Sequence, residues 1–238
     1  MINKTNAIVL SRIKYRDNDI IVKCFTEKDG LASYLLRGLL KSKKGNKTAY
    51  FQPLSQIEIV QSFKENQSLR SIREIKPVLV YKTLHTDIKK VSIAMFLSEV
   101  LYIVLQEEES NLELYRFLET SFQLLDEEVD YSNFHLLFLL KLTRFLGFYP
   151  NTSNINAPFF NIEKGIFEQE EKTLYSVSGK NLSILKTLLG TNFEALWQLQ
   201  LSAAQRQSFL TMLFLYFDLH LGNFRKPQSL EVFTQVFK

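Results

Sequence analysis

The strongest chemical signal in the sequence is a run of cations between Arg37 and Lys47. Five of these eleven residues are basic and none is acidic: Arg37, Lys41, Lys43, Lys44 and Lys47. Basic side chains that meet phosphates displace counterions, which gives affinity for a nucleic-acid strand without reading its bases. The run is therefore predicted to contact DNA, the alternative being a solvated surface loop.

A second basic group precedes this run. Arg12, Lys14 and Arg16 alternate with other residues, and alternate residues of a strand share one face. This face is predicted to be exposed and to assist DNA contact, with simple solvation as the alternative. Aromatic rings could add base stacking, and Tyr15, Tyr34 and Tyr50 are candidates, although most of the chain's 20 Phe and 10 Tyr must serve the core.

No pattern of catalytic or metal-binding residues emerges. His85, His135 and His220 fall in three separate helical patterns, without cysteine or carboxylate at metal-ligand spacing. Neither a phosphate-binding loop nor a nucleophile elbow occurs. Cys24 lies in an apolar strand and is interpreted as a small buried apolar residue. The acidic clusters at 107–109 and 126–130 are interpreted as solvated helix ends. We therefore predict no enzymatic activity, no catalytic residue, no cofactor and no bound metal.

The charge of the chain is divided unevenly. Its 238 residues carry a net charge of +4, but residues 1–80 hold an excess of eight cations and the remainder an excess of four acids. The single cysteine excludes a disulfide framework. No apolar stretch reaches the ~18 residues of a membrane span, and no signal peptide is recognised. The expected location is the cytoplasm, in association with the nucleoid and without membrane attachment.

The elements that position the basic residues are predicted to be strands. Short β-branched and aromatic runs occupy 5–13, 20–25, 31–37, 54–62 and 68–77. A turn with Gly30 separates the second run from the third. Five strands within about 75 residues suggest a small barrel, and the five-stranded OB-fold binds oligonucleotides on its open face.

Beyond residue 80 the apolar spacing becomes helical. Only residues 150–178, which are rich in Asn, Ser, Glu and Gly, return to short strand-like pieces. The predicted fold class is α+β, with a five-stranded OB-fold barrel, a mostly helical domain and a small inserted β-hairpin. The predicted domains are a DNA-binding barrel over 1–79, a helical domain over 80–149 and 179–238, and the insert over 150–178.

The order of local motifs resembles one known family. The motifs are Ala7-Ile8-Val9-Leu10, Tyr15-Arg16-Asp17-Asn18-Asp19, Phe25-Thr26-Glu27-Lys28-Asp29-Gly30-Leu31, the Arg37-Gly38 basic loop, Phe51-Gln52-Pro53-Leu54 and Phe145-Leu146-Gly147-Phe148-Tyr149-Pro150. Together they resemble the bacterial recombination mediator family RecO, whose basic loop matches Arg37, Lys41, Lys43, Lys44 and Lys47.

The resemblance implies an N-terminal OB-fold, a helical domain and a zinc-finger module inserted in that domain. It implies binding of single- and double-stranded DNA and annealing of complementary strands. It also implies partnership with RecR and with the acidic C-terminal tail of single-stranded DNA-binding protein, so that the recombinase RecA is loaded at gaps. Many members carry two CxxC pairs where this chain has residues 150–178, which contain no cysteine. The insert is therefore predicted to be a metal-free remnant.

Three other functions remain open from the sequence. The chain could be a generic OB-fold binder of single-stranded DNA without a mediator role. It could be a protein-interaction scaffold whose basic loop is incidental. It could also be an unrecognised nuclease, which would require its acidic clusters to converge around a metal.

Overall fold

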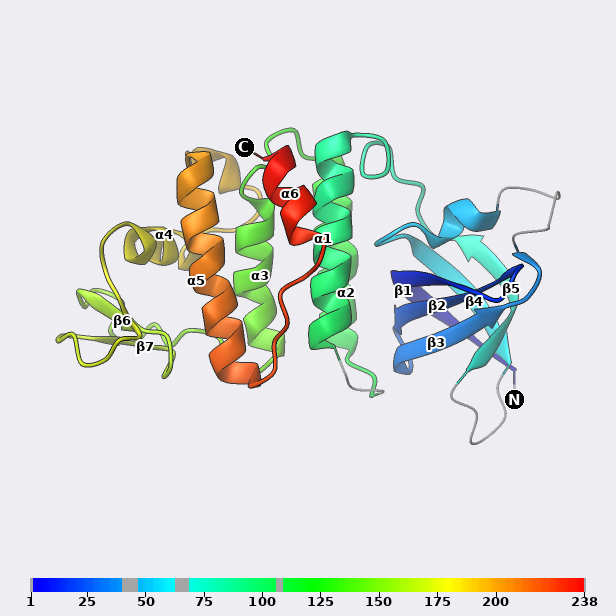
Figure 1. Ribbon diagram of the computed structural model, residues 1–238, viewed down its shortest axis with the longest axis horizontal. Helices are drawn as coiled ribbons and strands as arrows, with labels where there is room; N and C mark the ends of the chain where they lie inside the picture. Colours follow the sequence, from blue (N-terminus) through cyan, green and yellow to red (C-terminus); the bar gives the residue numbers. More distant parts are fainter. Residues whose placement is uncertain (1, 40–46, 63–68, 106–108, 238) are drawn as a thin grey trace. The chain divides into compact units, whose positions relative to one another are not determined.

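The computed structural model describes residues 2–39, 47–62, 69–105 and 109–237. The chain divides into two compact units (Figure 1). The first comprises Met1–Glu127 with Pro227–Phe233, and the second comprises Glu128–Lys226 with Thr234–Lys238. A late segment of the chain therefore returns to the first unit.

The first unit begins with a closed five-stranded barrel. Its strands are β1 (Ile2–Tyr15), β2 (Asp19–Thr26), β3 (Gly30–Leu36), β4 (Gln56–Ser62) and β5 (Arg70–Pro77). They pair in the order β1-β2-β3-β5-β4, and β4 closes the barrel on β1. The β3–β5 pair is parallel, whereas the other pairs are antiparallel. The short 3-10 helix η2 (Lys47–Phe51) precedes β4. The predicted five-stranded OB-fold barrel is confirmed.

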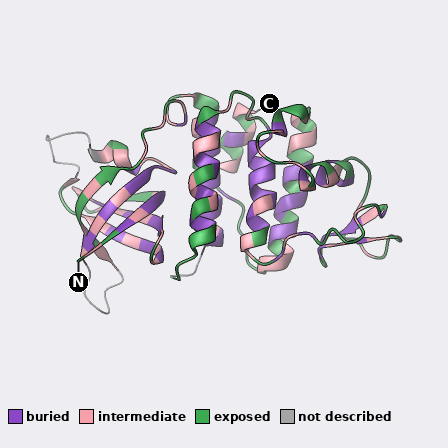
Figure 2. Ribbon diagram, turned by 180° about the vertical axis from the view of Figure 1, so that it is seen from behind, coloured by how far each residue is buried: buried purple, intermediate pink, exposed green. Residues whose placement is uncertain are grey.

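Alternating apolar residues fill the barrel, as period-2 strands with one face inside require (Figure 2). Val22, Cys24, Tyr34 and Ile59 are all fully buried in this core. Burial raises the pKa of the Cys24 thiol far above its ordinary value, so this thiol stays protonated and inert. The prediction that Cys24 serves as a small buried apolar residue is confirmed.

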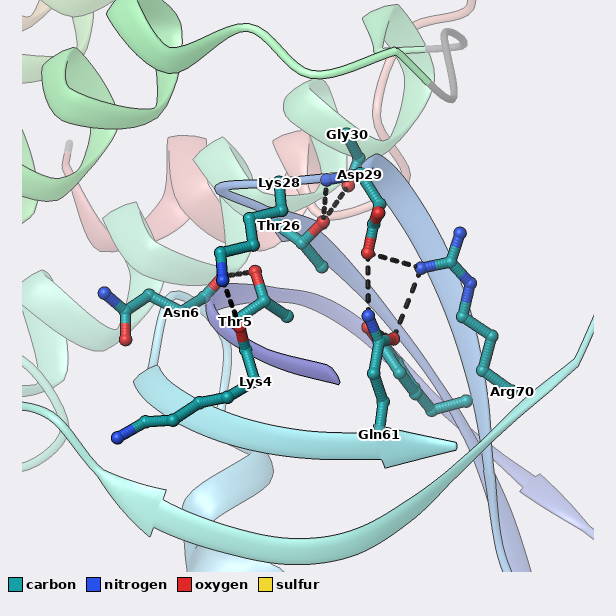
Figure 3. A network of polar contacts seen from close by, with 10 residues as sticks. Lys4, Thr5, Asn6, Thr26, Lys28, Asp29, Gly30, Gln61 and Arg70 are labelled. Carbon is teal, nitrogen blue, oxygen red and sulfur yellow. Dashed lines mark hydrogen bonds and ion pairs between the residues drawn. The ribbon is translucent and has the colours of Figure 1, made fainter. Parts of the chain in front are cut away.

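A polar network joins the β2–β3 turn to β4 and β5 (Figure 3). The Asp29 carboxylate accepts hydrogen bonds of 2.7 Å from both Gln61 and Arg70. The amide oxygen of Gln61 accepts in turn from the buried hydroxyl of Tyr34, at 2.9 Å. Because Arg70 starts β5 opposite Tyr34 in β3, this network fixes the one parallel pairing of the barrel.

Two helices complete the first unit, α1 (Ile88–Val104) and α2 (Leu112–Glu127). The returning segment docks on α1. The Glu99 carboxylate accepts backbone N–H bonds from Gln228 and Ser229, both at 2.8 Å. The ring of Phe96 stacks on Phe233 with centroids 4.6 Å apart. These contacts explain why Pro227–Phe233 belongs to the first unit.

The second unit is mostly helical. It contains α3 (Phe134–Phe145), α4 (Gly179–Leu189), the 3-10 helix η3 (Leu196–Gln198) and α5 (Ala203–Leu221). A last helix, α6 (Leu230–Val236), begins in the returning segment and ends in this unit. Nine of the twelve residues of α3 are buried, and this helix is mostly coloured as buried in Figure 2. A capping box of Ser202 and Gln205 begins α5, and Gly222 with φ of 72° ends it.

The insert forms a three-stranded sheet, so the predicted hairpin is extended by one short strand. The strands β6 (Phe159–Asn161), β7 (Ile166–Glu168) and β8 (Ser176–Val177) lie in the order β7-β6-β8. The buried side-chain oxygen of Asn161 accepts from the backbone N–H groups of Glu163 and Lys164. This bonding sets the tight turn between β6 and β7.

Aromatic packing and hydrogen bonds attach the sheet to α5. The ring of Phe160 contacts Phe167 and Tyr216. The Tyr216 hydroxyl donates to the Phe148 carbonyl, and Nε2 of His220 donates to the Ile162 carbonyl at 2.9 Å. Because side-chain packing holds this module together, its residues do not need a metal for cohesion.

The residues present here do not fit the zinc ion that the family resemblance implies. The insert has no cysteine. His220 is engaged with the Ile162 carbonyl and stacks on Phe148. Within the described part of the chain, no three His, Cys, Asp or Glu side chains are grouped as metal ligands.

The substitution Gly165→Ala is expected to destabilise the second unit by about 2 kcal/mol. Gly165 has φ of 67°, and a Cβ atom there would lie 2.8 Å from the Tyr216 hydroxyl, which its bond to Phe148 holds in place. Denaturant unfolding followed by the fluorescence of Trp197, the single tryptophan, measures the loss. Gly147→Ala is the matched control, because Gly147 also has a positive φ, of 86°, with open space at its Cβ. Equal losses in the two variants would contradict the proposed close packing.

Candidate nucleic-acid interface

Two of the predicted basic segments meet at one end of the barrel. The Asp19 carboxylate, at the start of β2, accepts the backbone N–H of Gly38 at 2.8 Å. Gly38 directly follows Arg37 and adopts φ of 66°, a conformation suited to glycine. Since Ile20 pairs with Leu36, the turn that contains Arg16 and the start of the basic run lie at the same barrel end.

Arg12 lies next to the other end of the basic run. Its guanidinium donates to the Thr48 carbonyl at 3.3 Å, and Thr48 belongs to η2, which follows the run. Arg12 and Lys14 are both exposed on β1. β1 ends at Tyr15, so Arg16 lies on the following turn instead of the strand face assumed in the sequence prediction. Its guanidinium lies 5.2 Å from the centre of the Tyr15 ring.

The structure describes only part of the basic run. Lys41, Lys43 and Lys44 lie outside the described residues, and for Lys47 only the backbone position at the start of η2 is described. Arg37 is described and exposed. The assignment of all eight basic residues to DNA contact thus stays a prediction.

A pocket opens beside Arg37, where β3 and β5 separate. These parallel strands pair only at Tyr34 with Arg70 and at Leu35 with Ser71. The pocket has a volume of about 330 Å³ and is lined by Leu35, Leu36, Arg37, Leu39, Phe51, Ser71, Ile72, Arg73 and Ile75. Sequence reasoning did not single out Arg73, because its proximity to Arg37 depends on a parallel strand pairing between distant segments.

The three candidate stacking tyrosines differ in accessibility. Tyr34 is fully buried and bonded to Gln61, so it was a wrong candidate. Tyr15 and Tyr50 are half-buried at the surface of the first unit. These two keep an accessible part for a ligand.

The histidines serve structural roles. Nε2 of His85 lies 2.9 Å from the Pro53 carbonyl, and His135 is buried inside α3. The interpretation of the 126–130 cluster as solvated is wrong for Asp126, which is buried and bonded to the backbone of residues 82–84. In the part of the chain that the structure describes, no helix is long and apolar enough to cross a membrane.

Comparison with known proteins identifies the family. Residues 1–81 match the family model described as Recombination protein O N terminal, and residues 85–230 match Recombination protein O C terminal. The DNA repair protein RecO of Christiangramia forsetii is 44% identical over 238 residues, covering 100% of both chains. That of Flavobacterium johnsoniae is 43% identical over 235 residues, covering 98% of both chains.

More distant relatives of the same name also align along their full length. The DNA repair protein RecO of Porphyromonas gingivalis is 28% identical over 244 residues, with 100% of both chains covered. The two family models together span the barrel and most of the helical part. This assignment supports the expectation that the protein is not an enzyme. The chain therefore belongs to the RecO family of DNA repair and recombination proteins.

Proposed function

We propose that this protein is a DNA-binding mediator of recombinational repair. It binds single- and double-stranded DNA through the basic end of its barrel and anneals complementary strands. With RecR, it loads RecA onto DNA that is coated by single-stranded DNA-binding protein. The observation that carries the proposal is that the basic run is tied to the barrel on both sides. Asp19 accepts from Gly38 at its start, and Arg12 donates to Thr48 just past its end.

The physical basis of annealing is electrostatic. Two DNA strands repel each other through their phosphates, and cations that neutralise those phosphates release counterions and permit close approach. Contacts of this kind are indifferent to base sequence. A mediator that must act at any gap in the genome needs that indifference.

We assign a separate role to each domain of the chain. The barrel over 1–79 serves as the DNA-binding domain, and the helical domain over 80–149 and 179–238 serves as the platform for RecR and for the acidic tail of single-stranded DNA-binding protein. Residues 150–178 form a metal-free remnant of a zinc finger. The protein acts in the cytoplasm on nucleoid DNA.

Salt-dependent DNA binding tests the basic run directly. Changing Lys41, Lys43, Lys44 and Lys47 together to Ala removes about three to four phosphate contacts. The slope of log affinity for single-stranded DNA against log salt should then fall by roughly 2 to 3 units, at ~0.7 per phosphate. Fluorescence anisotropy at several salt concentrations measures that slope.

The control for this experiment removes the same charge elsewhere. Lys89, Lys172, Lys180 and Lys226 are exposed and lie outside the barrel, so their joint change to Ala should leave the slope nearly intact. A slope that is the same in the wild type and in the basic-run variant would overturn the assignment of this run.

Two partner measurements separate the mediator from its rivals. A mediator binds both RecR and a peptide from the acidic tail, whereas a generic single-strand binder binds DNA alone. A scaffold with an incidental basic loop would show no salt-dependent DNA binding in the same anisotropy assay.

A further inference from the structure

The pocket between β3 and β5 exposes an edge of the barrel core. Leu36, Leu39, Ile72 and Ile75 pack against the buried core but are themselves only partly covered. Phe51 is fully buried beneath them. The two strands separate beyond Leu35 and Ser71, so the described residues leave an apolar floor uncovered at this place.

Two arginines border this apolar floor. Arg37 and Arg73 both line the pocket and both are exposed. Arg70, on the same strand as Arg73, has a different role, because its guanidinium is bonded to Asp29 and Gln61 inside the barrel (Figure 3). The pocket thus combines an apolar interior with a cationic rim.

We propose that this pocket receives one unstacked base of a bound DNA strand, while Arg37 and Arg73 contact the phosphates on either side of that base. The inference rests on the proposed DNA binding and adds a specific subsite to it. A volume of about 330 Å³ lies within the range of ~300–1,000 Å³ that accommodates small ligands. The apolar face of a base replaces water on the leucine and isoleucine floor.

Charge and continuity favour a nucleic-acid strand as the occupant. A base in a strand has a phosphate on each side, which matches an apolar floor bordered by Arg73 on β5 and by Arg37 directly after β3. The pocket also includes Arg37, the first residue of the basic run, so its occupant would be next to the proposed DNA-binding segment. The only hydroxyl side chain of the lining belongs to Ser71, which leaves few groups to read base edges and makes the subsite tolerant of sequence.

Filling the pocket without changing its charge tests this inference. Ser71 is exposed on β5 and lines the pocket, so Ser71→Trp should occupy the space meant for the base. The probes are oligo-dT and a fully abasic phosphodiester strand of equal length and charge. The wild type should bind oligo-dT about 5- to 150-fold more tightly than the abasic strand. Ser71→Trp should lower that ratio at least about fivefold, with an unchanged salt slope.

Two further variants keep the test decisive. Leu39→Ser removes part of the apolar floor outside the strands and should also reduce the ratio, whether or not the tryptophan variant folds. Ser183→Trp places the same substitution at an exposed position of α4, outside the barrel, and should leave the ratio unchanged.

Failure of the inference differs from failure of the proposed function. If the wild type binds DNA with a normal salt slope but Ser71→Trp and Leu39→Ser leave the ratio unchanged, the base subsite is wrong. If those variants instead lose binding of an acidic peptide with an aromatic end, while the ratio is unaffected, the occupant is a peptide and the inference is overturned. Absence of salt-dependent binding in the wild type would refute the proposed function itself.

Discussion

The substitution Asp126→Asn is expected to lower the free energy of unfolding of the first unit by about 3 kcal/mol. The Asp126 carboxylate accepts three backbone N–H bonds, from Lys82 at 2.9 Å and from Thr83 and Leu84 at 2.7 Å each. An asparagine side chain has one acceptor oxygen and an NH₂ group, which would face an N–H donor. At least one of the three backbone donors would therefore lose its partner.

A buried lysine makes a second link between the same two segments. The ammonium group of Lys90, only 3% exposed, donates to the Asp126 carbonyl at 2.8 Å and to the Thr83 hydroxyl at 2.7 Å. The segment that leads from the barrel into α1 is thereby fixed to the end of α2 within the first unit.

The pH dependence of this contribution has a definite sign. Burial alone would raise the pKa of Asp126, but the hydrogen bonds from Lys82, Thr83 and Leu84 outweigh burial and hold the pKa below its ordinary value. The folded state thus binds the proton less readily than the unfolded chain does. The stabilisation is fully present above the unfolded pKa of about 3.9 and is lost as the pH falls through the folded pKa.

Hydrogen exchange and denaturation measure the effect of this substitution. The amides of Thr83 and Leu84 should exchange faster in Asp126→Asn, and thermal unfolding followed by circular dichroism should begin at lower temperature. Asp87→Asn is the matched control, because Asp87 caps α1 through Lys89 and Lys90 N–H groups and asparagine caps a helix about as well. A loss in Asp126→Asn as small as in Asp87→Asn would contradict the anchoring role.

The contrast between Asp126 and the barrel shows what local sequence can predict. Strands and helices were predictable because apolar spacing of 2 or 3.6 residues is a local signal, and the five predicted runs correspond to β1–β5. Asp126 resembles an ordinary acid at a helix end. Its bonding partners lie 42 to 44 residues earlier, and no spacing rule connects them.

The same limit applies to the candidate site. Arg12, Lys14 and Arg37 are exposed, as their charge predicts, but the pocket next to Arg37 depends on the parallel register of β3 and β5. That register is fixed by Asp29, Gln61 and Arg70, which come from three distant segments. Charge runs therefore indicate the region proposed for DNA contact, whereas the apolar pocket requires the closed barrel.

Acidification should reveal a second buried group, His135. This side chain is 1% exposed in α3. Burial, with a smaller contribution from the charge of Arg206, lowers the pKa of His135 to about 3. The unfolded chain binds a proton near pH 6.5, so lowering the pH from 7.5 to 4.5 should cost the second unit about 2 to 3 kcal/mol through this residue alone.

The sign follows from the lowered pKa. Between about pH 6.5 and pH 3 the unfolded state carries a proton on His135 that the folded state does not, and stability therefore rises with pH across this window. This pH range lies mostly above that of Asp126, whose contribution to stability changes below about pH 4. The two contributions can be separated by the pH at which stability falls.

Replacing the imidazole by a group that does not titrate tests this origin. His135→Gln should remove most of the stability change between pH 7.5 and 4.5, measured by urea unfolding followed through Trp197 in the second unit. His85→Gln is the control, because His85 lies in the first unit and is only half-buried. In His85→Gln the change in stability between pH 7.5 and 4.5 should persist. If His135→Gln kept the full acid sensitivity, the proton taken up on unfolding would have to bind to another group. The expected loss of that sensitivity would show that burying an ionisable ring in α3 makes the second unit sensitive to acid.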